Sequence, residues 1–165
     1  MGKADPERGE SPTLLQQRFE AQEDEHRLLN YRRGAFLAAV FIALGAGMDW
    51  AAFGTPSAKS PEGVVGTLFL LRMACSCGLL FVLFLLYRVR SKSRRTLHLL
   101  GHLVALIPMV TIHGMLSETG GGGSPYYAGL NLVMVGTVLL LRWRCIDGVI
   151  SSTLCIVGYL AVALN

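Results

Sequence analysis

Long apolar runs alternate with short polar segments along most of the chain. A bilayer core about 30 Å thick needs about 20 helical residues, and each run is close to that length. The five runs cover residues 34–53, 63–87, 96–116, 126–143 and 146–164. The pattern predicts an all-α integral membrane protein. We expect residues 34–165 to form a bundle of five transmembrane helices behind a charged leader in residues 1–33.

Aromatic residues and prolines refine the third and fourth runs. Tyr126 and Tyr127 at one end of the fourth run, and Trp143 at the other, are suited to anchor its helix at the two membrane interfaces. We expect Pro125 in the first turn of this helix, where its missing N–H costs nothing. Pro108 lies inside the third run and predicts a kink there.

The composition agrees with burial in lipid. Hydrophobic residues make up 52% of the 165 residues and charged residues 16%, with a mean hydropathy of +0.48. Soluble domains carry about a quarter charged residues, more than this chain does. The high hydrophobic content also excludes the disordered, collagen-like and disulfide-scaffold classes. Cys75, Cys77 and Cys155 lie within the apolar runs, which favours small apolar side chains over disulfide partners. The first run is too long for the core of a cleavable signal peptide.

Positive charge lies on one side of the predicted bundle. Basic residues precede the first run and follow the second and the fourth, whereas the remaining loops carry mainly acids. The positive-inside rule places the N-terminus in the cytoplasm and, after five crossings, Asn165 outside. Either the protein ends there, or, as we expect, a sixth span follows. The basic residues are Arg27, Arg32, Arg33, Arg88, Arg90, Lys92, Arg94, Arg95, Arg142 and Arg144.

The leader predicts a helix that starts at Pro12. Its acidic half precedes its basic half, an order that suits a helix whose basic end meets anionic lipid headgroups. Leu15, Phe19 and Leu29 share one face. Two interpretations stay open: a solvated cytoplasmic leader, or a coiled-coil or partner-binding helix.

Four of the runs carry a polar residue at nearly the same depth. Counted from the cytoplasmic arginines, Asp49, Arg72, His113 and Tyr127 lie about 22 to 27 Å along their helices. A charged residue at a helix centre costs about 2.5 to 3.5 kcal/mol, so such residues are candidates for function. Asn131 lies one turn after Tyr127 on the same face. We expect these five residues to line an outward-facing pocket for a small ligand.

Asp49 and Arg72 also have structural interpretations. Both side chains are close enough to the outer interface to reach it, with Trp50 as a neighbouring aromatic anchor. Alternatively, Asp49 neutralises Arg72 in a closed network. Gly45, one turn before Asp49, is one of several small residues on that face that allow a second helix to approach closely.

The sequence predicts no catalytic residue, metal or cofactor in this chain. His98, His102 and His113 fall on one face of the third run, but the first and last lie too far apart along the axis to share one ion. A Walker loop, a zincin histidine pair and a G-x-S-x-G elbow are all absent from the sequence. We expect no nucleic-acid partner.

Residues 120–143 read GGGGSPYYAGLNLVMVGTVLLLRW. This segment, and Ser124 to Leu132 most of all, resembles the fourth-span motif of the N-terminal multi-span sensory regions of bacterial membrane histidine kinases and membrane-bound nucleotide cyclases. Those regions are six-helix bundles joined to a cytoplasmic signalling domain. The resemblance therefore implies a six-helix module, of which this chain lacks the last helix and the output domain.

From this resemblance we expect the membrane input module of a bacterial signal transducer in the inner membrane, the N-terminal part of a sensor histidine kinase. It implies a homodimer, surrounded by lipid, that responds to an unidentified small ligand. The input module of an adenylate or guanylate cyclase is one alternative. A small stand-alone transporter or channel subunit is another, although no internal repeat with broken helices is visible.

Overall fold

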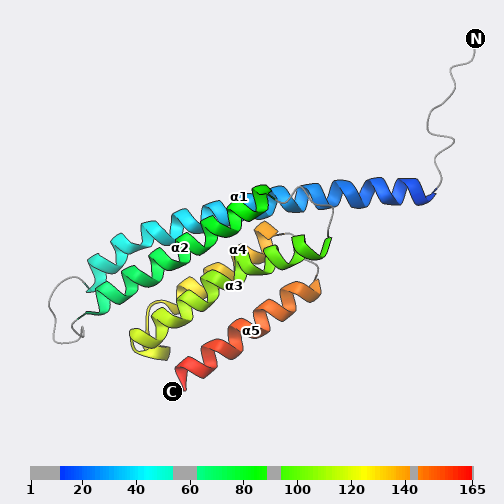
Figure 1. Ribbon diagram of the computed structural model, residues 1–165. Coiled ribbons are helices and arrows are strands. Elements are labelled where there is room, and N and C mark those ends of the chain that lie inside the picture. Colours follow the sequence, from blue (N-terminus) through cyan, green and yellow to red (C-terminus); the bar gives the residue numbers. More distant parts are fainter. Residues whose placement is uncertain (1–11, 54–62, 89–93, 142–144, 165) are drawn as a thin grey trace, which may run out of the picture.

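The computed structural model describes residues 12–53, 63–88, 94–141 and 145–164, which form five α-helices and one short 3-10 turn with no strand among them. The helices lie alongside one another in a bundle (Figure 1). Several residues used above fall outside these ranges: Arg90, Lys92, Arg142, Trp143, Arg144 and Asn165. The helices are α1 (Pro12–Phe53), α2 (Val64–Arg88), α3 (Arg94–Glu118), α4 (Tyr127–Leu141) and α5 (Cys145–Ala163), with the 3-10 turn η1 at Gly121–Gly123.

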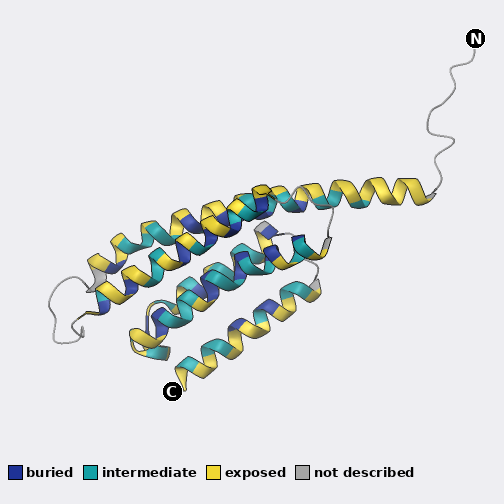
Figure 2. Cartoon of the chain, viewed as in Figure 1, coloured by how far each residue is buried: buried dark blue, intermediate teal, exposed yellow. Residues whose placement is uncertain are grey.

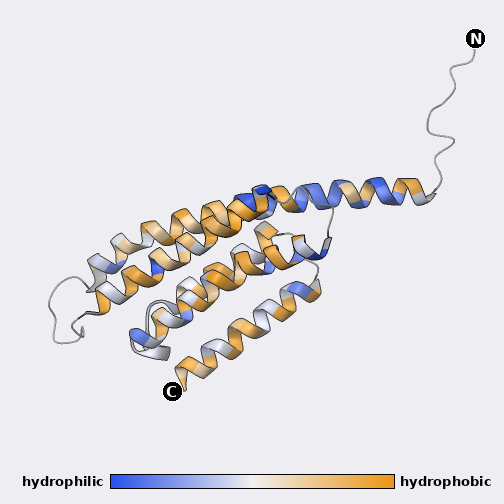
Figure 3. Ribbon diagram, in the orientation of Figure 1, coloured by the Kyte–Doolittle hydropathy of each residue, from blue (hydrophilic) through white to orange (hydrophobic). Residues whose placement is uncertain are grey.

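Helix α1 joins the predicted leader helix and the first predicted span into one element of 42 residues, about 63 Å long. It begins at Pro12, the predicted start. Its first half projects beyond the bundle and is mostly hydrophilic, whereas its second half is apolar (Figure 3). Glu23 and Arg27, one turn apart, form an ion pair at 2.5 Å that supports the projecting half.

Four of the five helices are long and apolar enough to cross a membrane: α1, α2, α3 and α5. Helix α4 has 15 residues, about 22 Å, which is shorter than the predicted fourth span. It begins at Tyr127, two residues after Pro125, and not with Pro125 in its first turn. The reason is a turn before the helix, in which the Ser124 hydroxyl accepts a hydrogen bond from the Tyr126 N–H at 3.3 Å.

The helices pack through small buried clusters that follow the bundle axis. Near the projecting half of α1, Tyr31, Leu86 and Leu100 join α1, α2 and α3. Gly101 makes room for the Tyr31 ring, because a Cβ there would lie 2.6 Å from two ring carbons. Arg32 also donates to the Leu86 carbonyl at 2.8 Å, which satisfies an acceptor in the last turn of α2.

The outward faces of the helices are apolar. Figure 2 shows exposed residues along the outside of every helix, and Figure 3 shows that most of those outside the projecting half are hydrophobic. Phe41, Leu70 and Leu139, for example, are exposed by about two thirds or more. A water-soluble bundle would carry polar residues at such positions.

Candidate functional site

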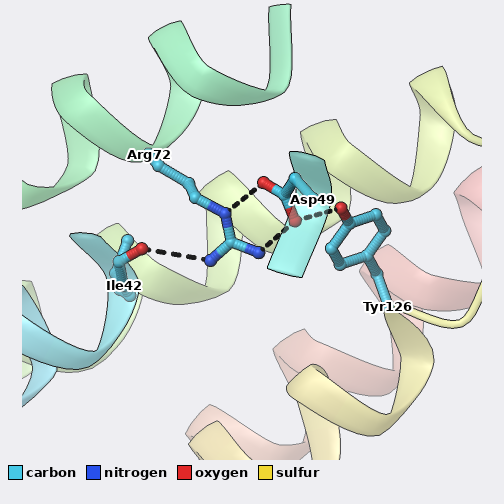
Figure 4. Close-up of polar contacts among 4 residues, drawn as sticks. All are labelled: Ile42, Asp49, Arg72 and Tyr126. Atoms are coloured by element: carbon cyan, nitrogen blue, oxygen red, sulfur yellow. Dashed lines mark hydrogen bonds and ion pairs between the residues drawn. The ribbon is translucent and has the colours of Figure 1, made fainter. Parts of the chain in front are cut away.

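The centre of the candidate site is an ion pair between α1 and α2 (Figure 4). The Arg72 guanidinium donates to both carboxylate oxygens of Asp49, from Nη2 to Oδ1 at 2.7 Å and from Nε to Oδ2. This two-point geometry gives the strongest kind of charge-assisted hydrogen bonding. Only 12% of the Arg72 side chain and 4% of the Asp49 side chain are exposed. The two side chains that the depth count brought to one level therefore meet directly and neutralise each other.

The surface of α1 fits the Arg72 side chain. The Arg72 Nη1 group donates to the Ile42 carbonyl at 3.1 Å (Figure 4). Gly45 lies under the guanidinium, because a Cβ at this position would come within 2.1 Å of Nη1. From the sequence we expect Gly45 to allow a second helix to approach closely, and in the structure Gly45 makes room for the Arg72 side chain. Three of the five N–H bonds of the guanidinium are held by Asp49 and Ile42.

Tyr126 completes the cluster, a role that the sequence interpretation gave to Tyr127. The Tyr126 hydroxyl donates to Asp49 Oδ1, and the Arg72 guanidinium lies 5.8 Å from the centre of the Tyr126 ring. Tyr127 is 52% exposed and points elsewhere. Successive residues of a helical turn diverge by about 100°, so only one tyrosine of the pair can face the carboxylate. The cluster of Asp49, Arg72 and Tyr126 joins α1, α2 and the start of α4.

His113, Tyr127 and Asn131 lie away from this cluster. The His113 imidazole spans α3 and α5, with Nδ1 at 2.7 Å from the Met109 carbonyl and Nε2 at 3.1 Å from the Cys155 carbonyl. Both partners are acceptors, and a neutral imidazole donates to only one of them. The described contacts bring Asp49 and Arg72 together and give His113 separate partners on α3 and α5. Residues at one depth on different helices need not face the same axis.

Tyr127 and Asn131 share one face, as expected, but that face lines a different space. Both are exposed and border a small cleft of about 200 Å³ between α4 and α5, beside Cys155 and Tyr159. Tyr127 and Asn131 therefore border this cleft and not the Asp49–Arg72 pair. The phase of α4, which starts at Tyr127, turns them toward α5 and the outside.

An apolar cavity of about 450 Å³ adjoins the Arg72 side chain. It lies between α1, α3 and α4, and its lining is hydrophobic or glycine except for Arg72 and Thr137. The Thr137 hydroxyl donates to the Met134 carbonyl of its own helix at 2.8 Å. Neither Asp49 nor Tyr126 lines this cavity, so Arg72 is the member of the cluster that contacts it.

The described residues contain no group of three His, Cys, Asp or Glu side chains that could hold a metal ion. His102 instead pairs with Asp147 in the first turn of α5, at 3.6 Å between Nε2 and Oδ1. This contact holds α5 to α3, as the His113 contact does further along.

The chain matches no protein-family model, and comparisons with curated proteins and with solved structures gave no significant match. The fold and the site define the chain as an all-helical bundle with membrane-length apolar helices and a buried Asp–Arg–Tyr cluster.

Proposed function

We propose that this chain is the membrane-embedded input module of a bacterial signal transducer, the N-terminal part of a sensor histidine kinase in the inner membrane. The observation that carries the proposal is the Asp49–Arg72–Tyr126 cluster, which joins α1, α2 and the start of α4 next to an apolar cavity. A ligand that alters the cavity would act directly on a junction of three helices, and a shift in their packing is the response required of a sensor.

Helix α1 offers a route from this site toward the cytoplasm. It runs without interruption from Asp49 to Pro12, about 55 Å. The positive-inside rule puts its projecting half in the cytoplasm. A displacement of α1 at Asp49 would therefore move a long helix beside the output domain. Leu15, Phe19 and Leu29 are exposed on this half and suit a contact with that domain or with a second subunit of a homodimer.

The proposed topology has five crossings with the N-terminus in the cytoplasm. Four helices meet the length requirement alone. Helix α4 is shorter, but it packs against α1 and α3 and therefore lies at the same depth as two membrane-length helices. A cysteine placed at Gly121, in the turn between α3 and α4, should react with an impermeant reagent added outside the cell. Reaction from the cytoplasmic side alone would contradict the topology.

The reading frame after codon 165 tests the proposed function first. A further apolar stretch followed by a kinase domain supports it, and an immediate stop codon contradicts it. In the full-length protein in membrane vesicles, ATP should then phosphorylate a histidine of the kinase domain. Arg72→Gln should change the level of this phosphorylation while the amount of protein in the membrane stays the same, and Gly66→Leu on the outside of α2 should leave it as in the wild type. Equal phosphorylation of the wild type, Arg72→Gln and Gly66→Leu would contradict a sensory role for the cluster.

A further inference from the structure

The shape of the apolar cavity limits what can occupy it. Its lining extends from Gly34 to Ile42 on α1, about 12 Å, and from Gly129 to Leu141 on α4, about 18 Å. A volume of about 450 Å³ along that length describes an elongated space that is partly open between the helices. A single extended hydrocarbon chain suits a space of this length and volume.

The chemistry of the lining points to hydrocarbon with one polar end. Along most of its length the cavity offers only aliphatic, aromatic and glycine surface. The charged group in its lining is the Arg72 guanidinium, at the end near Ile42, and the Thr137 hydroxyl is used within α4. The guanidinium edge beside Ile42 belongs to Nη1, whereas the Asp49 carboxylate lies at the opposite edge (Figure 4). An acceptor entering from the cavity therefore meets N–H donors of the guanidinium before it meets the carboxylate.

We propose that this cavity binds a single-chain amphiphile with a carboxylate head, such as a long-chain fatty acid. The head lies against the Arg72 guanidinium and the alkyl chain runs along α4 toward Gly34. The head accepts from the guanidinium N–H bonds that Asp49 and Ile42 leave, and the chain matches the length and apolarity of the remainder. The volume is in the range of natural small-molecule sites, about 300 to 1,000 Å³.

This inference names the ligand class of the proposed sensory site and rests on the proposed function for its orientation. With the N-terminus in the cytoplasm, Arg72 lies toward the outer end of the bundle and Gly34 toward the inner end. The amphiphile then has the orientation of a lipid of the outer leaflet, with its head outward. It can enter sideways from that leaflet, because the cavity is partly open between the helices.

Binding of radiolabelled palmitate to the whole chain in phosphatidylcholine nanodiscs tests the proposal without using any signalling output. We expect saturable binding that unlabelled palmitate displaces and that hexadecyltrimethylammonium, with the same chain and a cationic head, does not. Gly136→Leu should weaken binding by about tenfold or more, because Gly136 lines the cavity and a side chain there enters open space. The matched control Gly66→Leu also places its side chain in open space, but outside the cavity, and should bind as the wild type does.

Four outcomes would overturn the proposal. Equal binding by Gly136→Leu and wild type would mean partition into the bilayer and not into the cavity. Equal displacement by the cationic amphiphile would exclude recognition by Arg72, and displacement by phosphatidylglycerol as effective as that by palmitate would assign the cavity to a two-chain lipid. No palmitate binding combined with altered phosphorylation in Arg72→Gln would refute the ligand class and leave the sensory function standing.

Discussion

Replacement of Gly45 by alanine tests whether the buried cluster is held as tightly as its geometry indicates. A methyl group at position 45 would lie 2.1 Å from Nη1 of Arg72 and 2.6 Å from its Cζ, so the guanidinium has to move. Because that group is bound to Asp49 on one side and to the Ile42 carbonyl on the other, any movement lengthens several hydrogen bonds at once.

The expected cost follows from opposing effects. Alanine in place of glycine inside a helix normally stabilises it by about 0.8 to 1 kcal/mol. Overpacking costs about 1 to 3 kcal/mol, and each weakened hydrogen bond to a charged group about 1.5 to 3 kcal/mol. Complete separation of a buried pair costs about 3 to 5 kcal/mol, which sets the upper limit. We therefore expect Gly45→Ala to lower the free energy of unfolding by about 2 to 4 kcal/mol.

Reversible unfolding in mixed micelles, followed by the helical circular dichroism signal, measures this difference. Gly47→Ala on the same helix is the matched control, since a Cβ there would meet nothing within 4 Å. This variant should be neutral or stabilising by up to about 1 kcal/mol. In an Arg72→Met background, Gly45→Ala should lose most of its cost, and the cycle should show a coupling of about 2 kcal/mol. Gly45→Ala and Gly47→Ala of equal stability would refute the described packing.

Two further substitutions test the parts of the structure that the sequence did not predict. Tyr126→Phe removes the hydroxyl bonded to the buried carboxylate and should lower the free energy of unfolding by about 1 to 3 kcal/mol. Tyr127→Phe should change it by less than about 0.5 kcal/mol. A larger effect of Tyr127→Phe than of Tyr126→Phe would contradict the described contact of Tyr126. Gly158→Ala places a Cβ 2.7 Å from Nε2 of His113 and should loosen α5, at a cost of about 1 to 3 kcal/mol and with faster hydrogen exchange in α5. Gly148→Ala on the same helix, where a Cβ meets nothing within 4 Å, is its control, and equal exchange in the two variants would count against the His113 contact.

The length and position of the helices could be predicted from the sequence because they depend on local pattern. Apolar runs of about 20 residues between charged loops give four membrane-length helices close to the predicted boundaries. The joining of the leader to the first span was missed. No proline or glycine interrupts residues 13–33, and the signal for one continuous helix was therefore present in the sequence.

The candidate site could be predicted only in part. The sequence indicates the depth of a residue along the bundle axis, whereas the direction in which its side chain points depends on how the helices pack. Asp49 and Arg72 were found because opposite charges at one depth in an apolar bundle favour each other strongly. His113 has the same depth but bonds to backbone carbonyls of α3 and α5 instead. The choice of Tyr126 over Tyr127 depends on the residue at which α4 begins, and helix boundaries are the least certain part of a pattern.

The arrangement of contacts explains how a ligand in the cavity would act. Helices α1 and α2 share the largest interface in the described chain. They are held at three levels, by the Asp49–Arg72 pair, by Ser76 on the Ala39 carbonyl and by Arg32 on the Leu86 carbonyl. The cavity lies between α1, α3 and α4 and reaches Arg72 of α2 at one end. The hydrogen bond from the Tyr126 hydroxyl to Asp49 joins the start of α4 to α1. An occupant that separates α4 from α1 therefore strains the Tyr126–Asp49 hydrogen bond first. This strain acts on α1 near Asp49, at the end of α1 that lies opposite its projecting half.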